Sequence, residues 1–116
     1  MVGRISEMYI ELYPLIVILI LHFLADFVMQ DDKTATKKSK NNLILARHCF
    51  MYALPFFWFG WKFVVLAGLS HFAIDYVTSR VTSYLYLKQE RHYFFVTIGF
   101  DQLLHTLSLI ALYVFL

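Results

Sequence analysis

Cysteine is almost absent from this chain of 116 residues, in which Cys49 stands alone. A single thiol cannot form a disulfide within one chain, and it cannot build the paired-cysteine sites that hold structural zinc. Charged residues are also scarce, at 16% of the sequence, whereas 60% of the residues are hydrophobic and 19% are aromatic. A small domain leaves a large share of its surface in water, so a soluble domain of this length could not bury so many apolar side chains. We therefore expect lipid to be the solvent.

The few charges are concentrated, and the formal net charge is only +2. Most of them fall in two short stretches, residues 31–47 and 80–91. This distribution is typical of loops between membrane spans and not of a basic face that follows a nucleic acid. We expect membrane lipid and no nucleic acid as a partner, and the sequence leaves open a homo-oligomer or a partner membrane protein.

A cleaved signal peptide is not predicted at the N-terminus. Residues 1–11 carry one Arg and two Glu, which is a poor basic region for a signal, and no small-residue cleavage site follows the apolar run. Cleavage would also remove His22 and Asp26, so we expect the first helix to be retained.

Four apolar runs predict an all-α fold, an integral membrane four-helix bundle that forms a single transmembrane domain over residues 1–116. The runs cover approximately residues 9–29, 43–59, 61–78 and 93–116. At 1.5 Å per residue, helices of about 17 to 24 residues are long enough to cross the hydrocarbon layer. Trp58 and Trp61 flank a very short turn and predict a tight hairpin at the membrane interface.

Two basic loops set the predicted orientation. They carry Lys33, Lys37, Lys38 and Lys40 in residues 30–42, and Arg80, Lys88 and Arg91 in residues 80–92. With four spans both loops share one side of the membrane, and the positive-inside rule places that side in the cytoplasm. We expect a multi-pass protein of the inner (plasma) membrane, with both termini outside.

Three of the four runs carry an Asp and a His four residues apart. The pairs are His22 with Asp26, His71 with Asp75, and Asp101 with His105. This spacing puts both side chains on one helix face, about 6 Å apart along the axis. The order reverses in the fourth helix, which runs opposite to the first and third. Every Asp should therefore lie nearer the basic loops and every His about one turn deeper. His48 lies at about the same depth in the predicted bundle as these Asp and His residues.

The first and third runs also repeat a pattern, because HFLADFV at residues 22–28 matches HFAIDYV at residues 71–77. This predicts two helical hairpins related by a pseudo-two-fold axis along the membrane normal. The repeat is imperfect, since Ile44 stands where the fourth helix has Asp101.

Buried carboxylates need partners, because an ionisable side chain at bilayer depth costs about 2.5–3.5 kcal/mol. Apart from Arg47, the sequence shows no Lys or Arg at this depth. A hydrogen bond between the Asp and the His of one helix is the purely structural interpretation. The other interpretation is a bound metal ion, because carboxylate and imidazole together suit zinc, manganese or iron. We predict a divalent transition metal, zinc before manganese or iron, with the ligands His22, Asp26, His71, Asp75, Asp101 and His105. His48 is a further ligand or a catalytic general base.

These motifs resemble a known family. The segments HFLADFVMQ (22–30), HFAIDY (71–76) and DQLLH (101–105), with the Lys-rich loop and the region of His48, are similar to small bacterial and phage membrane proteins grouped as domain of unknown function 3307. The resemblance covers nearly the whole chain and implies no activity. A looser likeness, in His/Asp motifs on short transmembrane helices, is to membrane-bound metal-dependent hydrolases.

The leading functional hypothesis is a metal-dependent hydrolase whose ion activates water against a phosphate ester or a lipid headgroup. One alternative is an ion- or proton-handling protein in which the same Asp and His side chains relay charge. Another is a regulatory subunit whose polar core fixes the register of the helices. The sequence does not choose a substrate.

Overall fold

The computed structural model describes the backbone of residues 2–28, 30 and 37–116, and the side chains of these residues from Leu12 onward. Within these residues the regular structure is entirely helical, without a strand, which confirms the predicted all-α class. The expectations for Asp31, Asp32 and Lys33 lie outside the described residues.

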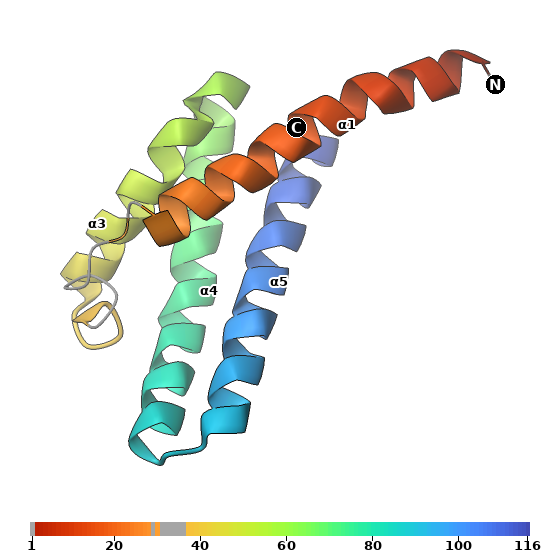
Figure 1. Cartoon of the computed structure of the whole chain (residues 1–116). Helices are drawn as coiled ribbons and strands as arrows, with labels where there is room; N and C mark the ends of the chain where they lie inside the picture. Colours follow the sequence, from red (N-terminus) through yellow and green to blue (C-terminus); the bar gives the residue numbers. More distant parts are fainter. Residues whose placement is uncertain (1, 29, 31–36) are drawn as a thin grey trace.

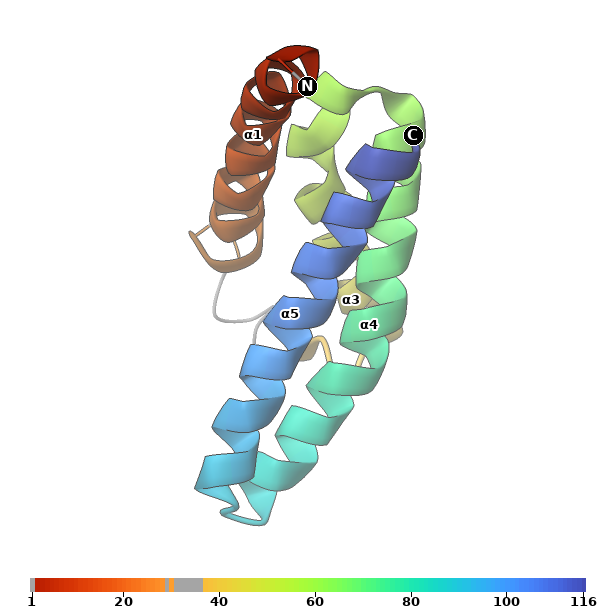
Figure 2. The same cartoon turned by 90° about the vertical axis from the view of Figure 1, so that its right-hand side faces the viewer.

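Each of the four apolar runs lies in a helical segment (Figure 1). They are α1 (Val2–Phe23), which continues as the π-helical turn η1 (Leu24–Val28), α3 (Asn42–Ala53), which continues as the 3-10 helix η2 (Leu54–Phe59), α4 (Trp61–Leu87) and α5 (Arg91–Phe115). Helices α4 and α5 lie side by side along their length (Figure 2), and α1 crosses in front of them.

Local sequence explains both ends of the second helical segment. The Asn41 side chain caps α3 by accepting hydrogen bonds from the backbone N–H groups of Leu43 and Ile44. At the other end Pro55 lacks an N–H group and its ring clashes with an α-helical carbonyl, so the chain tightens into η2. Gly60 alone separates η2 from α4, with φ +102°, a conformation that favours glycine. The predicted tight hairpin is confirmed.

The second basic stretch is largely helical, so the prediction of a loop over residues 80–92 is wrong. Helix α4 continues to Leu87, and three residues separate it from α5. No Gly or Pro interrupts this part of α4, so nothing local ends the helix earlier. It ends where Gln89 adopts φ +59° and the N–H of Glu90 donates to the Leu85 carbonyl at 3.0 Å.

The two helical pairs are therefore unequal. Helix α4 has 27 residues and α5 has 25, whereas α3 has 12. At 1.5 Å per residue α4 is about 40 Å long, which exceeds the roughly 30 Å hydrocarbon layer. The α4–α5 hairpin extends well beyond the ends of η1 and α3 (Figure 1). The predicted pseudo-two-fold axis would relate two hairpins of equal size, but the helix lengths of the two hairpins differ.

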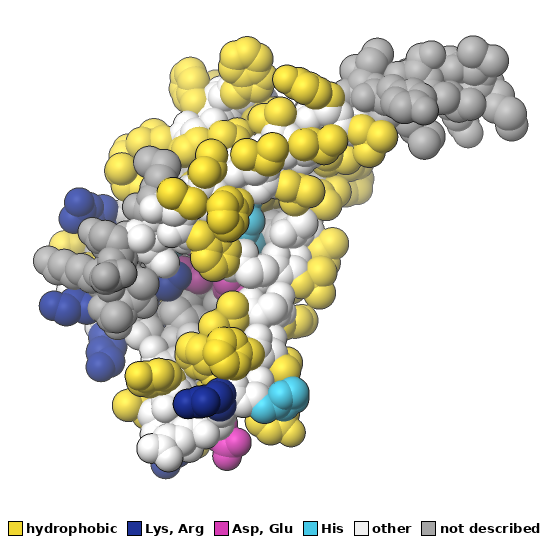
Figure 3. Space-filling model, viewed as in Figure 1, with side chains coloured by type: hydrophobic (Ala, Val, Ile, Leu, Met, Phe, Trp, Pro, Cys, Tyr) yellow, Lys and Arg dark blue, Asp and Glu magenta, His cyan; other side chains and the backbone are white. Residues whose placement is uncertain are grey.

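Apolar side chains lie mostly on the outside of the described part of the chain. The buried apolar cluster is small and comprises Ile18, Ala25, Tyr52, Phe56, Phe63, Ala67 and Leu109. Exposed large apolar side chains outnumber the buried ones and gather over the upper part of the view in Figure 3, while several Asp and His side chains are buried. By length and composition alone, Arg91–Phe115 is the one described helix that could cross a membrane, and Leu12–Val28 is a shorter apolar stretch.

Close packing of α3 on α4 generates a first prediction. A Cβ atom on Gly68 would lie 3.4 Å from the Ala53 Cβ, whereas one on Gly99 would meet nothing within 4 Å. Gly68→Leu should force the two helices apart and lower the free energy of unfolding by about 1–3 kcal/mol. Gly99→Leu, the control, should leave it unchanged or raise it by up to about 1 kcal/mol. Thermal unfolding in detergent measures both, and equal effects would contradict the packing.

Candidate metal centre

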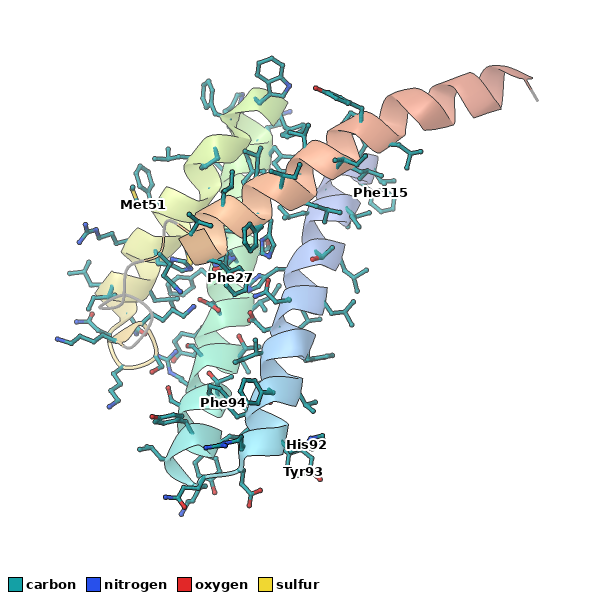
Figure 4. All side chains as sticks on the ribbon, in the orientation of Figure 1. Phe27, Met51, His92, Tyr93, Phe94 and Phe115 are labelled. Atoms are coloured by element: carbon teal, nitrogen blue, oxygen red, sulfur yellow. The ribbon has the colours of Figure 1, made fainter. Side chains whose placement is uncertain are left out.

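Seven ionisable side chains from all four helical segments meet in the interior. They are His22 and Asp26 from α1 and η1, His48 from α3, His71 and Asp75 from α4, and Asp101 and His105 from α5. Each is buried, with at most 9% of its surface exposed. The predicted convergence is confirmed, and none of these side chains points outward. Figure 4 shows nitrogen- and oxygen-bearing side chains of several helices turned toward the space between them.

The Asp and His of one helix share a face as the spacing predicts, but they make few bonds with each other. Nε2 of His22 is 3.9 Å from Asp26 Oδ2, and Nε2 of His71 is 3.6 Å from Asp75 Oδ2. Both distances are too long for a hydrogen bond. Asp26 lies in η1, the π-helical turn that follows α1.

Several short contacts run between helices. Nε2 of His48 lies 3.1 Å from Asp26 Oδ1 and 3.1 Å from Nε2 of His71. Nε2 of His71 is also 3.6 Å from Asp26 Oδ1. Nitrogen and oxygen atoms that can each donate an electron pair therefore face one another across three helices, which is the arrangement a shared cation requires.

Ring stacking holds two of these imidazoles in place. The His71 ring lies between the rings of Tyr52 and His105, with centroid distances of 3.9 and 4.0 Å. Nε2 of His105 is 3.1 Å from Asp101 Oδ1 and 3.7 Å from Asp75 Oδ1. It is nevertheless buried without an aligned hydrogen bond. A buried nitrogen directed at two carboxylates without a hydrogen bond fits a metal ligand.

Three overlapping sets of residues could each hold a metal ion, because the ligand atoms within each set lie within 4.8 Å of one another. They are Asp26, His48 and His71; His71, Asp75 and His105; and Asp26, Asp101 and His105. Around a tetrahedral ion with bonds of about 2.1 Å, neighbouring donor atoms are separated by about 3.4 Å. The contacts of 3.1 to 3.7 Å between donors match that separation. Each carboxylate has two oxygens, so the cluster offers donors for one ion or for two.

His22 takes a different position from the one expected of a ligand. Its Nδ1 lies 2.7 Å from the Tyr52 hydroxyl, and its Nε2 lies 2.7 Å from Gln102 Oε1. The Gln102 amide then donates to Asp26 at 3.2 Å and to Asp101 at 3.0 Å. The amide oxygen of Gln102 can only accept, so Nε2 of His22 is the donor in that hydrogen bond. His22 lies outside the three ligand sets and orients the glutamine that holds two carboxylates.

Lys38 is a site residue that the sequence prediction missed. Its Nζ lies 2.8 Å from Asp75 Oδ2, so the expectation that no lysine reaches this depth is wrong. The position of Lys38 just before α3 was the available signal, because a long side chain there can reach back over the helix ends.

Two further partners also went unpredicted, Tyr52 and Thr78. Tyr52 follows His48 by four residues, the same spacing as in the Asp–His pairs, so the sequence could have placed it on the site face. Thr78 follows Asp75 by three residues, and its hydroxyl lies within hydrogen-bond distance of Asp101.

A cavity of about 550 Å³ opens onto the cluster from the side of the α4–α5 hairpin. Its lining includes Asp26, Asp75 and Asp101 but none of the histidines. The carboxylates therefore face the cavity and the imidazoles lie behind them, as the reversed residue order predicted. A molecule in the cavity would approach a bound ion from the carboxylate side.

These features define a class of protein: a helical protein with a buried Asp/His cluster beside a cavity. The chain belongs to the family described as "Protein of unknown function (DUF3307)", whose model matches residues 14–116. No curated protein and no solved structure matches the chain significantly, so the comparisons do not connect it with metal-dependent hydrolases.

The glutamine bridge generates a second prediction. Gln102→Glu keeps the shape of the side chain but replaces the two amide donors to Asp26 and Asp101 by an acceptor. Loss of hydrogen bonds to charged groups should lower the free energy of unfolding by about 1.5–3 kcal/mol. Gln89→Glu, in the exposed turn after α4, is the control and should change it by less than about 0.5 kcal/mol. Denaturant titration in detergent compares them, and an unaffected Gln102→Glu protein would contradict the bridge.

Proposed function

We propose that the chain is a polytopic protein of the inner membrane. The inverted distribution of side chains supports this, because acids and histidines occupy the interior while Trp58, Tyr13 and Phe115 are 86%, 73% and 85% exposed. A soluble monomer rarely exposes apolar patches of this extent, and lipid is the surrounding that makes them favourable. The basic residues beside the cavity then lie at the cytoplasmic interface.

Within this membrane protein we propose a metal-dependent hydrolase. The observation that carries the proposal is the placement of three carboxylates and three imidazoles at metal-ligand spacing, with the carboxylate side open to a cavity. The ligands are Asp26, His71, Asp75, Asp101 and His105, with His48 as a further ligand or a general base. Zinc, manganese and iron suit this donor set, which contains no thiolate.

Charge supports the same assignment. Three carboxylates carry −3, and Lys38 compensates +1, so one divalent ion neutralises the cluster and a second gives it +2. The positive form attracts a phosphate group. A metal ion at such a site lowers the pKa of bound water and stabilises developing charge on phosphate oxygens. In the proposed reaction the water oxygen attacks phosphorus, the P–O ester bond breaks, and the leaving alcohol takes up a proton that the water releases.

The pair of Lys38 and Asp75 supports a second candidate, a protein that moves protons or ions, because it places a cationic group against a buried carboxylate of the cluster. Conduction across the membrane also needs a polar path on the far side of the cluster. Among the described residues the layer beyond the histidines is apolar and contains Ile18, Phe56 and Leu109. A site open on one side only favours the hydrolase.

Metal content tests the hydrolase proposal. Asp75→Asn preserves the shape of the side chain but removes a negative ligand from the cavity side, so it should reduce bound metal from stoichiometric to well below one ion per chain. Glu90→Gln neutralises an exposed carboxylate in the turn and should retain the metal of the unmodified protein. Elemental analysis of the folded, monodisperse fraction gives the readout. Full metal content in Asp75→Asn would refute the proposed site.

Orientation is tested separately by cysteine labelling in a Cys49→Ala background. Ser39 is buried against Ser83, so the exposed neighbour Lys37 is the better probe of the basic loop, and Leu116 is the probe of the other side. An impermeant thiol reagent should label Leu116→Cys in intact cells and Lys37→Cys only after the membrane is opened. Labelling of Lys37→Cys from outside would overturn the proposed topology.

A further inference from the structure

The cavity has two chemically different ends. Asp26, Asp75 and Asp101 lie at the end nearest the cluster with Lys38, which pairs with Asp75, and Lys40 is also among the lining residues. The rest of the wall is largely apolar and is formed by Phe27, Tyr86, Leu87, Phe94 and Ile98. In Figure 4, Phe27 lies near the end of the first helical segment and Phe94 lies lower, on the α4–α5 hairpin, and Figure 3 shows charged side chains in a hollow between apolar surfaces.

A row of hydroxyl groups on α4 connects the two ends. Thr78 and Thr82 are four residues apart, as are Ser79 and Ser83, so all lie on the face that lines the cavity. The Ser79 hydroxyl is buried without a hydrogen-bond partner, and its residue is only 7% exposed. A buried hydroxyl in this state favours a ligand that brings its own polar atoms into the cavity.

The position of the cavity adds a third constraint. It lies between the end of η1, the Lys38 segment and the part of the α4–α5 hairpin that extends beyond them. In the proposed topology this level is the cytoplasmic interface, where lipid headgroups are found. A volume of about 550 Å³ falls in the range of small-molecule sites.

We propose that the cavity binds a phosphorylated amphiphile. The phosphate group occupies the end with Asp26, Asp75, Lys38 and the metal, and the hydrocarbon chain lies against Phe27, Phe94 and Ile98. This inference rests on the proposed metal centre, because the three carboxylates and two lysines that line the cavity carry a net charge of −1 without it. Phosphate is shared by lipids and by soluble esters, and the apolar wall selects the lipid.

Two alkyl phosphates with the same headgroup test this. The full chain in detergent micelles is loaded with Co²⁺, and its visible absorption bands report phosphate binding at the metal without requiring turnover. Dodecyl phosphate should bind at least about tenfold more tightly than ethyl phosphate, since its chain can contact the apolar wall. Phe94→Ala should weaken dodecyl phosphate binding about three- to tenfold and leave ethyl phosphate binding unchanged.

Phe95→Ala is the matched control, because Phe95 is the next residue on α5, is 62% exposed and lies outside the cavity lining. Any partitioning of dodecyl phosphate into micelles is the same for both variants, so the control isolates the cavity wall. Equal affinity for the two phosphates in a cobalt-loaded protein would overturn the amphiphile proposal and leave the metal centre standing. Failure to bind cobalt would overturn the metal centre itself, and this inference with it.

Discussion

Burial of three carboxylates within a few ångströms of one another is the constraint on which the rest of the structure depends. Asp26, Asp75 and Asp101 come from three different helices, and like charges in a medium of low dielectric repel strongly. Every neighbouring feature compensates for them. The Gln102 amide donates to two, Lys38 pairs with the third, and the histidines present nitrogen atoms to all of them. The helices are thus joined by polar contacts in the centre and by a small apolar cluster on the side of Gly60.

Sequence periodicity predicted the regular part of this arrangement. Spacing of four residues fixes the helix face, and the reversed order of Asp101 and His105 follows from helix direction, so both could be derived without knowing the packing. The contribution of Lys38 could not be derived from the sequence, since it depends on how a segment outside the helices folds back. The charges of residues 80–92 predict a loop, but α4 continues to Leu87 because nothing in residues 80–87 breaks a helix.

The long α4–α5 hairpin determines where the site opens. Because η1 and α3 end at the level of the cluster and α4 and α5 continue, the carboxylates lie at the end of the four-helix part and not in a closed interior. The hairpin supplies the hydroxyl groups and the apolar wall of the cavity. A shorter α4, as the apolar runs suggested, would have left the same cluster without a binding cavity.

The distances within the cluster also bear on whether the Asp–His pairs serve structure alone. If each pair were a hydrogen bond on its own helix, the Asp–His distances within helices would be the shortest in the site. They are instead 3.9 and 3.6 Å in two helices, and the third, at 3.1 Å, is not aligned for a hydrogen bond. The contacts of His48 with Asp26 and His71 cross between helices. Donor atoms that converge from separate helices, with few bonds within the pair on each helix, fit a common ligand better than they fit three independent structural pairs.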